Sequence, residues 1–343
     1  MKTAESVTVP RRIRGSPWFD DGNIMLLLSD GEHPEPVIAF KVHRGVIARH
    51  SEIFESMLSM PAPVEEDETI EGCQVAHLYH DAPQELSDFI KALYDGVEFR
   101  HQSILDFFFV AGILRLSTKY SVKRLRVQAI RHLADTWSYT LRGHDNMVSL
   151  ALSSPSIDNA SYPYVHPLHV LNLARETSVT VLIPSVLYFL SIYSLEDVLR
   201  ANHPKLLVDH PSRPSSELNV DDIKAYTLMY QHRLHMMLDF IHKTCGERNE
   251  DVHCKHPAKQ CRRAFQRLKH NILHALSTRT GPFHNMQQAI HWVDADDEIC
   301  IPCKRAFLRD VTAVRERYWN ELPSVIGLRG WDELVASDLP ADA

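Results

Sequence analysis

The sequence lacks an apolar run long enough to cross a lipid bilayer. Its longest apolar stretch, VTVLIPSVLYFLSIY at residues 179–193, falls short of the ~20 residues that a spanning helix needs, and it contains Pro184. The first residues, MKTAESVTVPRRIRG, contain no apolar core of the kind found in secretory signals. We therefore expect no membrane partner and no secretion, and we expect the 179–193 stretch to form a buried helix.

The sequence also has few cysteines and no excess of positive charge. Six cysteines in 343 residues do not make a disulfide scaffold, so we expect a reducing cytoplasmic or nuclear compartment. In such compartments clustered cysteines more often bind metal or serve redox chemistry. The chain has 37 Lys and Arg against 44 Asp and Glu, a net charge of -7 at pH 7. This balance argues against a broad nucleic-acid surface, so we expect no direct nucleic-acid partner.

The first third of the chain has a mixed pattern of strands and helices. Apolar runs and alternation predict three strands, at residues 24–30, 37–43 and 73–80. The first two are expected to form a hairpin, and an acidic loop at 61–72 precedes the third. Apolar residues spaced by three and four predict helices that follow Arg44, Pro83, Ile104 and Val122. The helix over 104–116 is apolar nearly all round, which is typical of a central buried helix.

The rest of the chain carries almost no strand signal. Helical segments are expected near residues 168–200, 221–243, 258–278, 284–294 and 304–320. We therefore predict an α+β protein in three parts. These are a flexible tail at 1–17, a compact domain with a small sheet at 18–135, and a mostly α-helical domain at 136–343.

Four stretches of the first domain resemble the BTB/POZ family in order and spacing: FDDGNIMLLLSDG, FKVHRGVIARHSEIFESML, LSDFIKALYDG and VAGILRLSTKYSVKRLRVQAIRHL. The resemblance covers about residues 18–135. The DGNI form of the first stretch is similar to the BTB proteins that are abundant in mushroom-forming fungi. The resemblance implies a module that dimerises with itself or with another BTB protein. In many members of the family it also attaches to a cullin scaffold.

The resemblance also implies roles for individual residues. In the family, an Asp of the first motif and a basic residue after the motif His lie together near the dimer interface, and Asp21 and Arg44 match them. An ion pair there sets pairing geometry more than affinity. His43 is interpreted as a structural residue of the strand-to-helix turn, because no nucleophile signature accompanies it. Cullin-binding members often carry an apolar-x-Glu stretch, which Val64 and Glu66 match loosely.

Five of the six cysteines lie in the last hundred residues: Cys245, Cys254, Cys261, Cys300 and Cys303. A CxxC pair supplies two of the four soft ligands that tetrahedral zinc takes. Apolar residues recur every three or four positions after Cys261 and after Cys303, so both are expected at buried helix N-termini, which favour the thiolate. We predict a structural zinc site at Cys254, Cys261, Cys300 and Cys303. Reserve ligands are Cys245, His253 and His256.

These cysteines could also serve other roles. Thioredoxin-like redox chemistry needs a βαβ setting, which the pattern lacks, whereas ordinary buried thiols remain an alternative. Catalytic zinc needs an open coordination position. The cysteines with Trp292 and YWNELPSVIGLRGWDEL (318–334) also resemble the C-terminal region of the same fungal BTB proteins. We expect the 318–334 stretch to pack as a closing segment.

The expected function is protein–protein interaction without catalysis. BTB-mediated dimerisation would be combined with a helical half that binds partners. The alternatives are a substrate adaptor of a cullin-based ubiquitin ligase, or a transcription-associated regulator that acts through partners. The sequence has no recognisable kelch repeats, MATH domain or C2H2 fingers, so the helical half is expected to contact any substrate. No general base accompanies an open metal signature, which argues against a metalloenzyme.

Overall fold

The computed structural model describes residues 12–29, 37–60, 69–157, 160–256, 260–275 and 280–340. The α+β class is confirmed, because these residues contain fourteen α-helices and a five-stranded sheet. The chain divides into two compact units. Unit 1 comprises the chain up to Ile130 together with Asp209–Arg213, and unit 2 comprises Arg131–Val208 and the chain from Pro214 onward. The return of residues 209–213 to unit 1 was not indicated by the sequence pattern.

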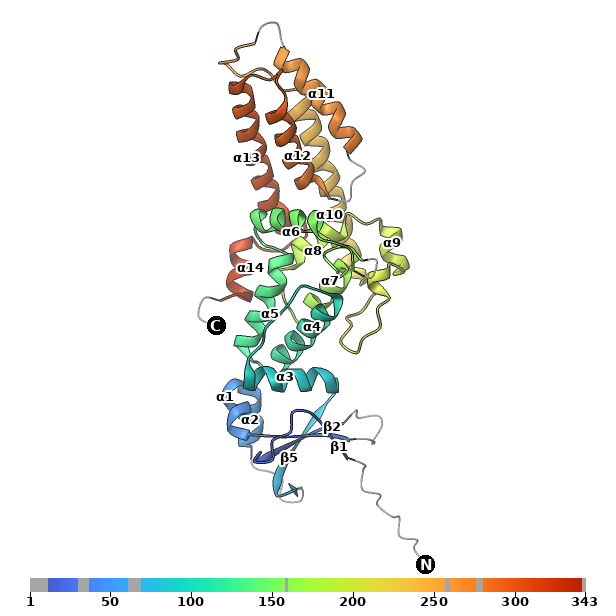
Figure 1. The fold of residues 1–343 in the computed structure, drawn as a ribbon, viewed down its shortest axis with the longest axis vertical. Helices are drawn as coiled ribbons and strands as arrows, with labels where there is room; N and C mark the ends of the chain where they lie inside the picture. Colours follow the sequence, from blue (N-terminus) through green and yellow to red (C-terminus); the bar gives the residue numbers. More distant parts are fainter. Residues whose placement is uncertain are drawn as a thin grey trace, which may run out of the picture. The chain divides into compact units, whose positions relative to one another are not determined.

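Unit 1 contains the whole sheet and the first helices (Figure 1). Its strands are β1 (Arg12–Arg14), β2 (Ile24–Ser29), β3 (Val37–Val42), β4 (Thr69–Ile70) and β5 (Cys73–Tyr79). Its helices are α1 (Arg44–His50), α2 (Glu52–Ser59), α3 (Pro83–Asp95), α4 (Ile104–Lys119) and the first part of α5 (Lys123–Thr136). The three longer strands and the helices lie where the sequence predicted them. The helix expected after Arg44 is divided in two.

The sheet has the strand order β1-β3-β2-β5-β4. β2 and β3 pair antiparallel, as the predicted hairpin requires, and β5 pairs parallel with β2. Two strands contradict the prediction: β1 lies within residues 1–17, which were expected to be a flexible tail, and β4 lies within the loop expected at 61–72. β1 pairs parallel with β3, and β4 pairs antiparallel with β5. Both are too short to show the alternation that reveals a strand in a sequence.

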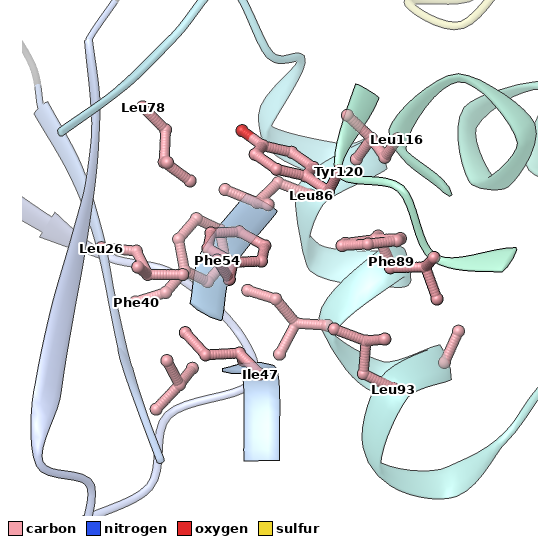
Figure 2. Packing of buried hydrophobic residues seen from close by; sticks show 14 of the residues in the cluster. Leu26, Phe40, Ile47, Phe54, Leu78, Leu86, Phe89, Leu93, Leu116 and Tyr120 are labelled. Carbon is pink, nitrogen blue, oxygen red and sulfur yellow. The ribbon is translucent and has the colours of Figure 1, made fainter. Parts of the chain in front are cut away.

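One face of the sheet and the helices enclose the core of unit 1 (Figure 2). Its labelled members come from six elements and the end of α4: Leu26, Phe40, Ile47, Phe54, Leu78, Leu86, Phe89, Leu93, Leu116 and Tyr120. The other face of β2 is buried as well, because Met25 and Leu27 pack with Ala39 and Cys73. Burial on both faces explains why β2 is a continuous apolar run rather than an alternating one.

Local capping chemistry sets the helix boundaries of unit 1. The hydroxyl of Ser51 accepts a hydrogen bond from the amide of Phe54 at 3.0 Å, which starts α2. Ser103 and Asp106 form a reciprocal capping box at the start of α4. α4 is then buried on most of its surface, which confirms the predicted central helix.

Residues 209–213 complete unit 1 by packing on its helices. The His210 ring stacks on Phe108 with 4.7 Å between ring centroids. The carbonyl of Ser212 accepts a hydrogen bond of 3.0 Å from Arg115. Arg115 also pairs at 2.7 Å with Glu85, whose side chain is only 7% exposed. The guanidinium of Arg115 therefore contacts both this segment and the buried carboxylate of Glu85.

In the described part of unit 2, helices and helical turns are the regular structure, apart from an isolated bridge between Ile157 and Ala160. Its first helices are α6 (Leu141–Ser153), α7 (Pro167–Glu176), α8 (Ile183–Leu190) and α9 (Leu195–Arg200), followed by the 3-10 turn η1 (Pro204–Leu206). The later ones are α10 (Val220–Asp239), the π-helical turn η2 (Phe240–Gly246), α11 (Gln260–Ala275), α12 (Pro282–Ala295), α13 (Ile301–Val325) and α14 (Trp331–Asp338). Of these, neither α6 nor α14 was predicted as a helix.

The apolar stretch at 179–193 forms α8 and the turns beside it. Pro184 lies in the first turn of α8, where a missing N–H breaks no helical hydrogen bond. Seven of the eight residues of α8 are buried, so the predicted buried helix is confirmed for this part of the stretch. Across the described ranges, none of the helices has the length and apolarity needed to cross a membrane.

Helices α10 to α13 lie side by side in unit 2 (Figure 1). Arg315 of α13 is buried and pairs at 2.6 Å with Asp145 of α6. Trp319 of α13 stacks on Trp331 of α14 with 5.8 Å between ring centroids. The expected closing segment is therefore packed, and it holds α14 against α13.

Candidate metal centre

The four predicted cysteine ligands meet in one cluster of unit 2. Cys261 lies in the first turn of α11, Cys300 is the N-cap of α13, and Cys303 lies in its first turn. Cys254 lies in the loop between η2 and α11. The four sulfur atoms all lie within 4.8 Å of one another. Segments that are far apart in the sequence thus bring four soft ligands to one point.

The distances between the sulfur atoms fit a tetrahedral ion. The Sγ atom of Cys254 lies 3.7 Å from Sγ of Cys261 and 3.7 Å from Sγ of Cys300. Zinc–sulfur bonds of about 2.3 Å in a tetrahedron place the sulfur atoms about 3.8 Å apart. A disulfide needs about 2 Å, and all four cysteines are free thiols. The cluster is therefore compatible with a zinc site and not with a disulfide pair.

Backbone amides and a helix terminus favour thiolates at this cluster. The amide of Cys300 donates to Sγ of Cys261 at 3.4 Å, and the amide of Asp251 donates to Sγ of Cys303 at 3.4 Å. Cys300 and Cys303 also lie at the N-terminus of α13, where the helix dipole stabilises negative charge. These are the outer contacts that orient and tune metal-bound cysteines.

The pKa values of Cys261, Cys300 and Cys303 are shifted in different directions. Burial raises the pKa of Cys261 to about 11 and also raises the pKa of Cys303. At Cys300 burial acts in the same direction, but hydrogen bonds from the backbone of Lys255 and Cys303 outweigh it and lower the pKa to about 6. Neighbouring thiolates repel one another, and a divalent cation at the centre compensates that repulsion.

The cluster has the character of a closed site. Cys261, Cys300 and Cys303 are 0%, 6% and 1% exposed, and Cys254 is half-buried. Four sulfur ligands fill every position of a tetrahedron, so no position is left for a water molecule or a substrate. An ion held here has a structural role.

The reserve ligands lie outside the four-sulfur cluster. Cys245 is fully buried in η2, and burial raises its pKa to about 12. His253 is exposed, and its amide donates to Asp251 at 2.9 Å. Nδ1 of His256 lies 3.0 Å from the carbonyl oxygen of Glu298, to which it donates, and 3.8 Å from Sγ of Cys261. The hydrogen bond of His256 to Glu298 therefore holds the Cys254 loop beside the cluster.

An aromatic layer supports the cluster one helical turn away. Phe265 of α11 stacks on Phe307 of α13 with 5.4 Å between ring centroids. The guanidinium of Arg248 lies 5.2 Å from each ring and pairs at 2.8 Å with Asp310. The two helices thus have contacts of their own, in addition to any metal that joins their N-termini.

Three of the predicted interaction residues of unit 1, Asp21, His43 and Arg44, lie at or beside the turn between β3 and α1. Nε2 of His43 lies 3.2 Å from Asp21 Oδ1, and Nδ1 lies 3.0 Å from the hydroxyl of Tyr94. The same hydroxyl accepts the amide of His43 at 2.8 Å. Because the hydroxyl can then donate to Nδ1, the proton of a neutral His43 lies on Nε2 and faces Asp21. The hydrogen bond from His43 lowers the pKa of Asp21.

The expected pair of Asp21 with Arg44 is not formed within the chain. The guanidinium of Arg44 donates to the carbonyl of Leu58, and its amide donates to Asn23 at 2.8 Å. The side chain of Asp21 is 86% exposed, so its carboxylate faces solvent as well as His43. Val64 and Glu66, the expected cullin contacts, lie outside the described residues.

Comparison of the chain with models of known protein families found no match, and comparison with curated proteins found none either. The resemblance of residues 18–135 to BTB/POZ domains therefore depends on the quoted motifs. The candidate metal centre depends on the positions of its four sulfur atoms.

Proposed function

We propose that this chain is a non-enzymatic interaction protein in which unit 1 dimerises as a BTB/POZ-type module. Its zinc-bound helical unit 2 carries the surface that binds partners. The observation that carries the proposal is where the resembling motifs lie. All four of them contribute side chains to one core, through residues such as Leu26, Phe40, Leu93 and Tyr120. Motifs that build a shared core behave as the signature of a fold rather than as scattered matches.

The closed cysteine cluster supports the same proposal. A four-sulfur site stabilises a fold and offers no open position for chemistry. Zinc at this site would join the N-termini of α11 and α13 to the loop of Cys254. Unit 2 would then present a fixed surface, which lowers the entropic cost of binding a partner.

The dimer is tested by sedimentation of the full chain at micromolar concentration. We expect twice the chain mass of 39.3 kDa. Asp21→Lys reverses an exposed charge at the proposed interface, so we expect it to weaken the dimer about tenfold or more, since like charges opposed across an interface cost several kcal/mol. Asp21→Asn keeps an acceptor for His43 and should weaken it less.

A matched control separates the interface from a general effect of charge. Glu98→Lys changes a carboxylate whose side chain is 84% exposed and leaves Asp21 in place. We expect it to leave the dimer intact. A wild-type chain that sediments as a monomer at micromolar concentration contradicts the proposal.

Partner identity needs a separate experiment. The adaptor and regulator alternatives differ from each other in what the dimer binds, not in whether it forms. Affinity purification of the full chain followed by mass spectrometry distinguishes them. Recovery of a cullin scaffold supports the adaptor, and recovery of chromatin-associated proteins without a cullin supports the regulator.

A further inference from the structure

A pocket of about 450 Å³ lies within unit 2, away from the cysteine cluster. Its walls are mainly aromatic and aliphatic, with Trp137, Tyr162, Phe189 and Met147 among them. It also reaches exposed residues such as Leu152, which is 60% exposed, so the pocket opens to solvent. Its size and apolar lining fall in the range of small-molecule sites, about 300–1,000 Å³.

The lining of the pocket includes a buried cation. Lys205 is only 6% exposed although it is a lysine. Among the described residues, the single acceptor for its Nζ is the carbonyl oxygen of Pro163, at 2.6 Å. No carboxylate of the described residues pairs with this lysine. A lysine is almost never fully buried without such a partner.

Within the described residues, the charge of Lys205 is therefore incompletely compensated. An ammonium has three donors, and one carbonyl oxygen satisfies one of them. Burial lowers the pKa of Lys205 to about 8, so the group is still mainly charged at neutral pH. A buried charge is normally paired because desolvation is costly. An anion in the pocket would supply the missing partner.

We propose that this pocket binds a small monocarboxylic acid with an apolar body. The carboxylate accepts from the ammonium of Lys205, and the apolar body packs among the aromatic side chains. A single negative charge matches a single cation, because Lys205 is the only Lys or Arg among the described residues that line the pocket. The lining carboxylate, Asp197, is exposed, and it disfavours ligands of higher negative charge.

The proposal is tested with 4-phenylbutyrate and its uncharged analogue 4-phenylbutan-1-ol, each titrated calorimetrically into the full chain. We expect one saturable site for the carboxylate. Lys205→Met keeps an apolar stem of similar length and removes the charge. It should weaken 4-phenylbutyrate about tenfold or more, as expected for loss of a hydrogen bond to a charged group. Binding of the alcohol should not weaken.

Two further variants keep the test decisive. Ala151→Trp leaves the lysine in place and fills the pocket beside Tyr162, so it should abolish binding of both probes even if Lys205→Met fails to fold. Lys224→Met removes an exposed lysine of α10 and should bind as the wild type does. Wild-type protein that binds neither probe overturns the proposal. Equal affinity of 4-phenylbutyrate for the wild type and for either pocket variant overturns it as well.

Discussion

Replacing Cys303 with serine removes one sulfur ligand and preserves the first turn of α13. Zinc at the cluster would close a loop of about 50 residues from Cys254 to Cys303, and a cross-link of that length removes about 4 kcal/mol of chain entropy from the unfolded state. We therefore expect the variant to lose its zinc and about 4 kcal/mol of unfolding free energy. The stacked Phe265 and Phe307 remain, so the variant should still fold.

The assay combines metal analysis with urea unfolding of the full chain. Wild-type protein should hold one zinc per chain, and removing the zinc with a chelator should lower its unfolding free energy to that of Cys303→Ser. Adding zinc back should restore the wild type and leave the variant unchanged, because ligand binding stabilises only the state that binds. Cys245→Ala is the matched control, since it alters a buried cysteine outside the cluster and should retain the zinc.

Two results would refute the reasoning. The first is wild-type protein that is fully folded and free of metal after expression in zinc-containing medium. The second is a Cys303→Ser variant that keeps one zinc per chain. The first result would favour ordinary buried thiols at all four positions, which was the alternative that the sequence left open.

Two other changes test the energetics of unit 2. Asp338→Ala should lower the unfolding free energy by about 2–4 kcal/mol. One carboxylate oxygen of Asp338 accepts hydrogen bonds from the amides of Thr180 and Val181, at 2.6 and 2.7 Å. Urea unfolding of the wild type, Asp338→Ala and the control Asp338→Asn measures this loss. Lys205→Met should raise stability by up to about 3 kcal/mol below pH 8. In the wild type, burial lowers the pKa of Lys205 from 10.5 to about 8, so the free-energy cost of burying the charged lysine is fully present below pH 8. The gain should shrink as pH rises from 8 towards 10.5, and unchanged differences at pH 7 and pH 10 would contradict it.

Helical periodicity indicated that the cysteines meet, because Cys261 and Cys303 share a helix face with apolar residues. Cys261 and Phe265 are four residues apart on α11, as Cys303 and Phe307 are on α13, and all four are buried. A buried stripe places its first residue at the helix N-terminus, where the two cysteines meet. The partner loop of Cys254 could be named because it is short and close to Cys261 in the sequence.

Other features depend on contacts that a linear pattern does not contain. At the turn from strand to helix, adjacent side chains point in different directions. For this reason His43 contacts Asp21, whereas the Arg44 side chain contacts Leu58. α6 was missed because one of its buried positions is His144, which breaks the apolar spacing. Lys205 gave no signal at all, since a lysine is expected at the surface.

The return of residues 209–213 to unit 1 has a consequence for how the protein is made on the ribosome. Unit 1 includes the ring of His210 and the carbonyl that Arg115 contacts, so it is incomplete when residue 130 has been synthesised. About 80 further residues must be added, which takes roughly 4–16 s at the usual rates of translation. During that interval the stacking face of Phe108 and the donors of Arg115 lack these partners. Nascent chains shorter than 213 residues should therefore be more sensitive to proteolysis in α3 and α4 than longer ones.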